Sequence, residues 1–503
     1  MSTAVVIGGG FGGLAAAIRL RAKGYEVILV DRSSRLGGRA QVFERDGYRH
    51  DAGPTVITAP FLFEELFELL GARLEDYVKF VPLSTWYRFH YPDGSQFDYG
   101  GTIDDTLAEI AKISPEDCDG YRGLLAESEQ IYKVGFERLS DAPFHRLQDM
   151  MKQAPAMIRL GSRRTVWQLV SRHLKHPKLR QAFSVQPLLV GGNPFSTTSI
   201  YNLIHFLERA HGVHFAMGGT GALVEALERL MREVGIKIRL NTTVDQIETT
   251  ADRATGIRLD SGEHLPADIV VANADPAFLY NNMLSRKHSR LSAKLKARHA
   301  RKSMALFVLF FGTEGTYDDV AHHTIWLGQR YKGLLDDIFR RKVLADDFSL
   351  YLHRPTATDP SFAPAGHDSF YALVPVPNLE ADIDWSVAGP RLRDRVVGAL
   401  DETILPGLKS KIRSDFFMTP EDFLADYLSP AGAGFSIAPH FTQSAWFRFH
   451  NKAEGPENLY LVGAGSHPGA GLPGVLCSAK VVDNLLPAVG RVTVERGDLV
   501  AAK

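Results

Sequence analysis

A glycine-rich turn near the N-terminus has residue types and spacing that suit a dinucleotide. Gly8, Gly10 and Gly13 lie within Gly8-Gly9-Gly10-Phe11-Gly12-Gly13, and Asp31 follows eighteen residues after the last glycine. Glycine permits a tight turn and a close approach of backbone N–H groups to a pyrophosphate, and a carboxylate at this distance accepts hydrogen bonds from a ribose diol. The pattern therefore predicts a dinucleotide cofactor.

The segments around this turn have the patterns of a strand, a helix and a second strand. Residues 4–7 are apolar and β-branched, residues 14–20 have apolar positions at helical spacing before Gly24, and residues 26–30 are again apolar. Short apolar runs of this kind fit strands buried on both faces of a parallel sheet. Since every flanking element is present, the unit matches the fingerprint of a Rossmann-like fold.

Two further turns provide groups that suit a flavin dinucleotide. Gly37 and Gly38 lie between arginines in the segment 35–39, where glycine permits a second approach to the pyrophosphate and Arg39 neutralises its charge. The turn at 51–55 ends in Pro54-Thr55 and is suited to run beside a ring system. These turns favour FAD over NAD.

The C-terminal region has a complementary glycine-rich loop. An apolar strand pattern at 458–462 is followed by glycines from Gly463 to Gly474 and then by a helical pattern over 478–486. A helix that begins at such a loop favours negative charge, and a flavin develops negative charge at its N1–C2=O edge when it accepts a hydride. We therefore expect the two ends of the chain to bind one flavin together.

These motifs resemble the bacterial-type phytoene desaturases, carotenoid-biosynthetic members of the flavin amine-oxidase-like superfamily. The resemblance extends over essentially the whole chain and is most specific at the C-terminal signature. The matching segments are VVIGGGFGGLAAAIRL (5–20), RLGGRA (35–40), DAGPTVIT (51–58), LLVGGNPF (188–195), GGTGALV (218–224), NAD (273–275), AGFSIAP (433–439), QSAWFR (443–448) and NLYLVGAGSHPGAGLPGV (458–475).

The resemblance implies an FAD enzyme that introduces successive double bonds into phytoene, a C40 hydrocarbon, to form neurosporene or lycopene. Oxygen and a quinone are both open as electron acceptors. Val244 is expected in a strand at 237–244 whose backbone meets the adenine. The expected FAD contacts are Gly8, Gly10, Phe11, Gly12, Gly13, Asp31, Arg32, Gly37, Gly38, Arg39, Pro54, Thr55, Val244, Gly465, Gly474 and Val475.

Other functions of the same fold remain alternatives. One is another carotenoid desaturase or an isomerase, with hydroxylated or C30 substrates. A flavin amine oxidase would need an aromatic cage and a polar amine site, for which the sequence gives no warrant. A non-redox protein that binds prenyl lipids is disfavoured because this chain keeps every glycine of the fingerprint and Asp31.

Since cofactor motifs lie at both ends of the chain, the FAD-binding domain must be discontinuous. We predict an α/β fold in which residues 1–90, 216–280 and 456–503 form the Rossmann-like FAD-binding domain. Residues 91–215 and 281–455 would form an inserted substrate domain, with a helical membrane-facing region at about 102–210. Apolar strands at 305–311 and 370–376 predict a mixed sheet beneath the flavin.

An acid-free stretch suggests contact with a membrane. Residues 150–207 contain no Asp or Glu, and Trp167 and several apolar residues lie among basic ones. The basic residues are Lys152, Arg159, Arg163, Arg164, Arg172, Lys175, Lys178 and Arg180. A second basic run covers 286–302. Such segments suit a headgroup zone, although a solvated helix face paired with acids elsewhere is the alternative. We expect a peripheral, monotopic protein on the cytoplasmic side of the membrane.

Composition excludes several classes of protein. The 503 residues have a formal net charge of −1, which gives no basis for nucleic-acid binding. Two cysteines cannot form a disulfide framework or a cysteine metal cluster, and they suit a reducing compartment. No apolar run approaches the ~20 residues of a membrane-spanning helix.

The proton acceptor that desaturation requires is not evident from the sequence. Asp149 and His205 are the candidates, with a helix cap as the alternative for Asp149. Because His205 lies in an apolar helical stretch, we expect it to be a core histidine instead. His467 is a further candidate catalytic residue, which would orient the flavin loop that it follows. His322-His323 has no partner at metal-ligand spacing, so we expect no metal site.

Overall fold

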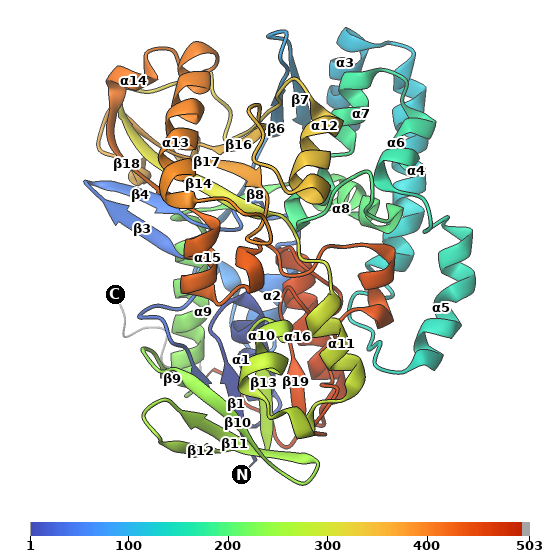
Figure 1. Ribbon diagram of the computed structural model, residues 1–503, viewed down its shortest axis with the longest axis vertical. Coiled ribbons are helices and arrows are strands. Elements are labelled where there is room, and N and C mark those ends of the chain that lie inside the picture. Colours follow the sequence, from blue (N-terminus) through green and yellow to red (C-terminus); the bar gives the residue numbers. More distant parts are fainter. Residues whose placement is uncertain (1, 495–503) are drawn as a thin grey trace.

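A five-stranded parallel sheet forms the base of the molecule (Figure 1). The computed structural model describes residues 2–494. The strand order is β19-β13-β1-β2-β9, and β1 is hydrogen-bonded to β2 and β13. The strands are β1 (Thr3–Ile7), β2 (Glu26–Val30), β9 (Lys237–Arg239), β13 (Ile269–Ala272) and β19 (Leu459–Leu461). Distant segments of the chain thus build one Rossmann-like sheet.

This sheet is covered on both faces, as its apolar strands require. One face packs on α1 (Phe11–Ala22), α9 (Gly219–Glu233) and α16 (Leu472–Leu485). The other face packs on an antiparallel sheet of β10 (Val244–Thr250), β11 (Arg253–Leu259) and β12 (His264–Pro266).

The prediction of one continuous strand at 237–244 was wrong, because the strand in the structure is shorter. β9 ends at Arg239, and Asn241 has a positive φ of 49°, which turns the chain away from the parallel sheet. Val244 is instead the first residue of β10, in the antiparallel sheet. Sequence pattern alone did not separate these two strands because Leu240, Thr242 and Thr243 between them are apolar or β-branched, as strand residues often are.

The second half of the molecule is built on the predicted mixed sheet. Its order is β18-β14-β17-β16-β15-β6-β7, and β15 is parallel to β6 while the other neighbours are antiparallel. The strands are β6 (Thr85–His90), β7 (Gln96–Gly100), β14 (Ala305–Glu314), β15 (His323–Trp326), β16 (Leu350–His353), β17 (His367–Val376) and β18 (Ile412–Met418). Since β6 belongs to it, this sheet begins before residue 91.

Alternation along β14 divides the apolar side chains between the two faces of this sheet. Phe307, Leu309 and Phe311 pack beneath α13 (Trp385–Glu402). Leu306 lies on the opposite face, among residues that line a cavity. The mixed sheet therefore separates a closed core from the wall of a cavity.

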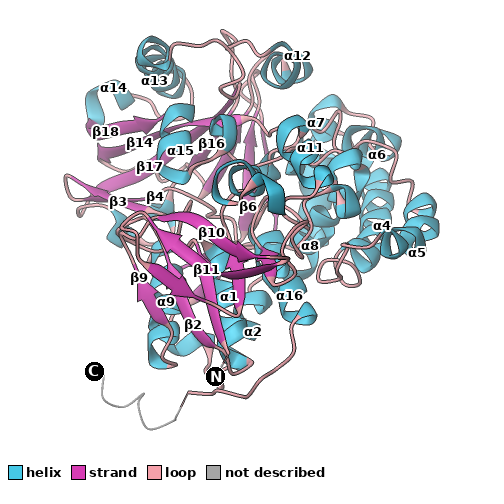
Figure 2. Cartoon of the chain, turned by 60° about the horizontal axis from the view of Figure 1, so that its bottom comes forward, coloured by secondary structure: helices cyan, strands magenta, loops and turns pink. Residues whose placement is uncertain are grey.

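The helices between residues 103 and 211 cover one edge of the mixed sheet (Figure 2). They are α3 (Ile103–Ile113), α4 (Asp117–Gly135), α5 (Leu147–Arg159), α6 (Val166–His173), α7 (Pro177–Phe183) and α8 (Leu203–His211). Within residues 2–494, no helix has the length and apolar character needed to cross a bilayer.

Shorter helices and strands complete the described part of the chain. They are β3 (Val42–Arg45), β4 (Tyr48–Asp51), β5 (Phe80–Pro82), β8 (His214–Ala216), α2 (Phe61–Glu68), α10 (Pro276–Phe278), α11 (Leu291–His299), α12 (Tyr331–Asp336), α14 (Leu408–Lys411) and α15 (Pro420–Tyr427). β4 leads directly into the turn at 51–55, which therefore lies between the parallel and the mixed sheet.

Candidate functional site

One cavity of about 640 Å³ lies between the two halves of the molecule. At one end it is lined by the glycine turns of the parallel sheet, and at the other by side chains of the mixed sheet and of the helices. The apolar part of its wall includes Val185, Leu188, Leu189, Val190, Ile204, Leu207, Leu306, Leu327, Leu335, Ile338 and Leu373. This part of the wall suits a ligand that is mostly hydrocarbon.

The glycine turns from the two ends of the chain meet at one edge of this cavity. A Cβ added to Gly12 would lie 3.0 Å from the amide nitrogen of Gly463 and 2.5 Å from Oδ1 of Asn273. A Cβ on Gly13 would lie 1.9 Å from the carbonyl oxygen of Gly8. These two glycines are therefore required by close packing, Gly12 between the two turns and Gly13 between α1 and the end of β1.

The cavity brings together nearly all the residues that the sequence assigned to the cofactor. Gly13 is the exception, since it packs behind the turn and does not line the cavity. Those that line the cavity are Gly8, Gly10, Phe11, Gly12, Asp31, Arg32, Gly37, Gly38, Arg39, Pro54, Thr55, Val244, Gly465, Gly474 and Val475. Val244 reaches the cavity although it belongs to a different sheet from the one predicted.

Asp31 is fixed in orientation by backbone donors. Its Oδ2 accepts a hydrogen bond from the Gly9 N–H at 2.6 Å, and its Oδ1 accepts one from the Ser33 N–H at 2.7 Å. Each carboxylate oxygen has a second lone pair, so Asp31 can still accept hydrogen bonds from hydroxyls in the cavity. This arrangement suits a ribose diol.

Arg39 has donor capacity that the described protein groups do not satisfy. Its Nη2 donates to the Ser429 hydroxyl at 2.9 Å, while its buried Nε has no hydrogen-bond partner among the described residues. Burial lowers the pKa of Arg39, although the Asp275 carboxylate favours the charged form. A cation held in this way at a cavity wall fits an anionic group such as a pyrophosphate.

The C-terminal glycine loop is held by a buried arginine that sequence reasoning missed. Arg448 donates from Nε to the Ser466 carbonyl at 3.0 Å and from Nη2 to the Ala464 carbonyl at 2.5 Å. Its side chain is almost fully buried. The residue ends the segment QSAWFR, so the motif was a signal, but its spacing from the loop did not reveal the contact.

The candidate residues Asp149, His205 and His467 have different surroundings. Asp149 lies half-buried in the first turn of α5 and does not line the cavity. His205 is buried and bonds to the Tyr99 hydroxyl, as expected of a core histidine. His467 lines the cavity, but its Nε2 contacts the Leu139 carbonyl at 3.1 Å and its Nδ1 is buried without a partner. Burial lowers the pKa of His467 to about 4.

A buried carboxyl group in the cavity wall was not predicted from the sequence. Glu208 lies on α8, its Oε1 accepts a hydrogen bond from the Tyr87 hydroxyl at 2.8 Å, and its Oε2 has no described partner. Burial raises the pKa of Glu208 to about 8. At neutral pH the group is therefore largely protonated, and it holds a proton within an apolar wall.

This raised pKa gives a pH-dependent stability. Because the pKa of Glu208 is higher in the folded state than in the unfolded chain, its contribution is fully present below the unfolded pKa and is lost as pH rises toward about 8. We expect Glu208→Gln to be more stable than the unchanged protein at alkaline pH, by on the order of a few kcal/mol. The difference should nearly vanish at acidic pH.

Thermal unfolding of the cofactor-free proteins across this pH range measures the effect. Other titrating groups are common to both proteins and cancel in the comparison. A stability difference that stays constant between acidic and alkaline pH would show that Glu208 is not a buried neutral acid.

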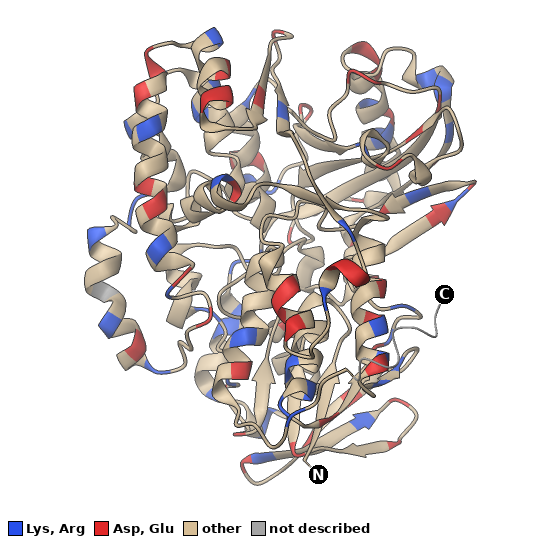
Figure 3. Ribbon diagram, turned by 180° about the vertical axis from the view of Figure 1, so that it is seen from behind, with Lys and Arg blue, Asp and Glu red and all other residues tan. Residues whose placement is uncertain are grey.

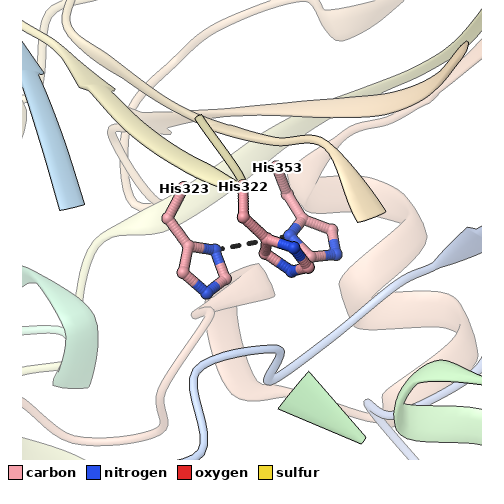
Figure 4. Close-up of side chains that lie close together, drawn as sticks. All are labelled: His322, His323 and His353. Atoms are coloured by element: carbon pink, nitrogen blue, oxygen red, sulfur yellow. Dashed lines mark hydrogen bonds between the residues drawn. The ribbon is translucent and has the colours of Figure 1, made fainter. Parts of the chain in front are cut away.

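Three buried histidines that do not line the cavity form a cluster (Figure 4). Their nearest ring nitrogens, one from each of His322, His323 and His353, lie within 4.8 Å of one another. The sequence argument that His322-His323 has no partner was wrong, because pairing of β15 with β16 places His353 directly opposite His323. A separation of thirty residues gave no local signal for this contact.

Comparison with known proteins shows what the chain is similar to. Residues 11–482 match the family of flavin-containing amine oxidoreductases. The chain is 47% identical to a lycopene-forming phytoene desaturase from Pseudescherichia vulneris, with 97% of this chain and 99% of that protein covered. It is 44% identical to a neurosporene-forming phytoene desaturase from Rhodobacter capsulatus, with 97% and 94% covered.

The fold is also that of solved structures. An oxidoreductase from Methanosarcina mazei superposes with a TM-score of 0.64 at 18% identity, covering 96% of this chain and 100% of that one. At this identity the likeness concerns the fold alone.

Proposed function

Because this chain belongs to the flavin-containing amine oxidoreductases and, within them, to the phytoene desaturases, we propose that it uses FAD to introduce successive double bonds into phytoene, with lycopene or neurosporene as the product. One observation supports this function above others. A single cavity joins the dinucleotide-type glycine turns to a long apolar wall, so a redox cofactor and a hydrocarbon can meet in one space.

The residues at the glycine end of the cavity fit FAD. Arg39 is positioned to pair with the pyrophosphate, Asp31 to accept hydrogen bonds from the ribose, and the start of α16 at Leu472 to favour negative charge near the ring. Bound FAD supplies a hydride acceptor. Arg448 keeps the loop at Ala464 and Ser466 in the conformation that borders this site.

The apolar end of the cavity performs the remaining tasks. Phytoene has no charge and no hydrogen-bonding group, so shape and apolar contact are what can orient it. Side chains such as Leu188, Leu327 and Leu335 exclude water from the carbon atoms that lose hydrogen. Loss of a hydride beside a double bond leaves an allylic cation, which a dry apolar wall protects from attack by water.

Expression in cells that accumulate colourless phytoene tests this function. We expect coloured carotenes in a pigment extract, with lycopene or neurosporene as the end product. Unchanged phytoene would contradict the function. Products only from C30 or hydroxylated carotenes, in a host that makes them, would identify another carotenoid desaturase. Isomerised carotene would identify an isomerase. A bound prenyl lipid without FAD would identify a non-redox lipid-binding protein.

We also propose that the protein docks on a membrane through α5. One side of this helix lines the cavity through Met150, Gln153 and Met157. Leu147, Met151 and Ile158, which lie elsewhere on the same helix, are 53%, 66% and 75% exposed. A helix that is apolar toward the cavity and also toward solvent suits a hydrocarbon entrance at a bilayer surface.

Exposed apolar residues next to α5 support docking through the same face of the molecule. The segment η11 (Ala445–Phe447) lies against α5, and Phe447 is exposed. α11 adjoins this segment, since Lys296 donates to the Arg448 carbonyl at 3.0 Å. Leu291 and Leu295 on α11 are exposed as well. Together these residues extend the apolar surface beyond α5.

Ion pairs with acidic residues leave only some of the basic residues free to contact lipid headgroups. Four of the eight basic residues of the acid-free stretch form ion pairs with acids outside it: Arg164 and Arg172 with Glu127, Lys175 with Glu116, and Lys178 with Asp93. Lys152 and Arg159 lie on α5 and have no described ion pair; basic residues are visible along this helix at the edge of the molecule (Figure 3). The alternative of a solvated face paired with acids therefore applies to residues 164–178, around α6 and α7, rather than to α5.

Liposome partitioning tests the docking surface. Changing Leu147, Met151 and Ile158 together to serine should lower binding to phytoene-free anionic liposomes at least about 10-fold, because full burial of one such side chain is worth about 1.5–3 kcal/mol. Val387→Ser is the control, since Val387 is 44% exposed on α13, away from α5. Equal partitioning of the triple variant and the control would rule out docking through α5.

The proposed side of the membrane is the cytoplasmic one. Basic residues near an exposed apolar helix favour the anionic cytoplasmic leaflet.

The proposed electron acceptor that reoxidises the flavin is oxygen or a quinone. Anaerobic turnover with an added quinone, compared with turnover in oxygen, decides between the two acceptors. Product formed with neither of them would contradict both.

A further inference from the structure

A patch of hydrogen-bonding side chains interrupts the apolar wall of the cavity. Thr55 Oγ1 lies 3.0 Å from the Tyr351 hydroxyl and 2.8 Å from the Tyr371 hydroxyl, and all three residues line the cavity. Thr55 belongs to the turn at 51–55, which lies in the same cavity as Gly465 and Val475. Polar groups at this point have no obvious partner in a hydrocarbon substrate.

The patch continues behind the wall into the histidine cluster. The Tyr351 hydroxyl lies 2.6 Å from Nδ1 of His323, and that nitrogen lies 3.4 Å from Nδ1 of His353. Strand alternation places Tyr351 and His353 on one face of β16, and pairing of β16 with β15 places His323 opposite His353. The dashed line in Figure 4 marks the contact between the two histidines.

The following proposal rests on the proposed desaturase function. We propose that the hydroxyl oxygen of Tyr351 takes up the proton that each desaturation releases. In exchange, Tyr351 gives its own phenolic proton to His323. Desaturation removes a hydride from one carbon and a proton from its neighbour. The hydride goes to the oxidised flavin, the proton goes to Oη of Tyr351 as the phenolic proton passes to Nδ1 of His323, and the electron pair of the broken C–H bond becomes the new double bond. Tyr351 is thus the catalytic residue, and His323 acts through it.

The histidines are in the protonation state that this step requires. Burial lowers the pKa of His323 and of His353, and it lowers that of His322 to about 3. At neutral pH the three imidazoles are therefore free bases. An allylic carbocation is a very strong acid, so even a base of low pKa accepts its proton. The low pKa also favours onward release of the proton.

Among residues 2–494, no carboxylate forms a hydrogen bond or ion pair with His323. Those that face the cluster are Tyr351, Tyr371, Tyr87, His322, His353 and Arg354, with Asp51 and Glu208 farther away beyond the tyrosines. Arg354 is itself buried and is paired with Asp368 at 3.0 Å. A guanidinium beside three neutral imidazoles disfavours a divalent cation there, so proton transfer fits the charges better than a metal.

Other acceptors near the cavity are less suitable. Glu208 is largely protonated at neutral pH. Nε2 of His467 is already bonded to the Leu139 carbonyl, and its Nδ1 is buried. Asp149 lies outside the cavity wall. Tyr351 differs from all three because it lines the cavity and is hydrogen-bonded to a neutral base.

The histidine cluster also has a contact through which a proton can reach the solvent. Nδ1 of His322 lies 2.7 Å from the Thr358 hydroxyl, and Thr358 is half-exposed. The Nε2 atoms of His322, His323 and His353 are buried without described partners. Free nitrogens within one cluster allow a proton to pass from His323 toward Thr358 and the solvent.

Tyr351→Phe tests the proposal in single-turnover reactions of the FAD-loaded enzyme with phytoene in liposomes. We expect the rate of product formation to fall about 100-fold or more, in the range found for loss of general acid–base catalysis. A solvent deuterium isotope effect on product formation should be present in the unchanged enzyme and absent in the variant. His323→Gln should lower the rate and the isotope effect in the same way.

Tyr99→Phe is the matched control. Tyr99 bonds to Nδ1 of His205 at 3.1 Å, in a buried tyrosine–histidine pair that does not line the cavity. Its removal should leave both the rate and the isotope effect unchanged. FAD content and melting temperature, measured for each variant, show whether a variant is folded and loaded.

Imidazole ¹⁵N spectra of the cofactor-free protein give a readout that is independent of turnover. We expect His323 to be neutral and its Nδ1 signal to move in Tyr351→Phe. Equal rates and isotope effects in Tyr351→Phe and the unchanged enzyme would overturn the proposal, and so would one equivalent of bound metal that His353→Gln removes. If the unchanged enzyme makes no product, the desaturase function itself fails, which is a separate result.

Discussion

Replacing Gly12 with valine is expected to abolish the retention of FAD through purification. The added Cβ would lie 2.5 Å from Asn273 Oδ1 and 3.0 Å from the Gly463 amide nitrogen, so the two glycine turns would have to separate. Overpacking of this kind costs about 1–3 kcal/mol, which corresponds to roughly 5- to 150-fold in FAD affinity when the cofactor needs both turns in place. Fluorescence titration of FAD measures the loss.

The control is Gly398→Ala on the surface of α13. A Cβ there would have its nearest neighbour, Lys409 Nζ, at 4.0 Å, and the residue is helical. FAD affinity should be unchanged, and stability should rise slightly because alanine favours the helix. Retention of FAD by Gly12→Val at normal affinity would mean that the junction of the two turns does not form the cofactor site.

Replacing Arg39 with methionine should weaken FAD binding about 10- to 100-fold, since a charge-assisted hydrogen bond contributes about 1.5–3 kcal/mol. The stability of the cofactor-free protein should stay within about 1 kcal/mol, because loss of the Nη2 bond to the Ser429 hydroxyl is offset by removal of a buried cation whose Nε has no described partner. Binding and stability should therefore separate in this variant. Calorimetric titration and thermal unfolding measure the two quantities.

Arg35→Met makes the same change of charge at an exposed residue four positions earlier in the chain. It should bind FAD normally. If Arg39→Met loses as much stability as affinity, Arg39 is a structural residue and its place at the cavity wall has no bearing on the cofactor.

The sequence was informative wherever a motif has fixed local spacing. Strand, glycine turn, helix and acid follow one another within residues 3–31, so the unit around Gly8 and Asp31 could be predicted without long-range information. The meeting of Gly12 with Gly463 was inferred because both ends had the character of one cofactor site. The mixed sheet followed from long apolar strands such as β14.

The residues that the sequence did not reveal depend on strand register and on helix placement. His353 meets His323 because of the particular pairing of β15 with β16, and apolar patterns do not determine a register between strands 27 residues apart. Glu208 becomes a buried neutral acid because α8 faces the cavity, whereas its neighbour Arg209 points toward Trp86. Such contacts emerge only when the elements are assembled.

Anaerobic mixing of the FAD-loaded protein with phytoene in liposomes tests the central claim most directly. The account predicts that the blue absorbance of the oxidised flavin bleaches in one turnover and that one new double bond forms per flavin bleached. Bleaching without any change in phytoene, or a flavin that stays oxidised beside bound phytoene, would contradict it.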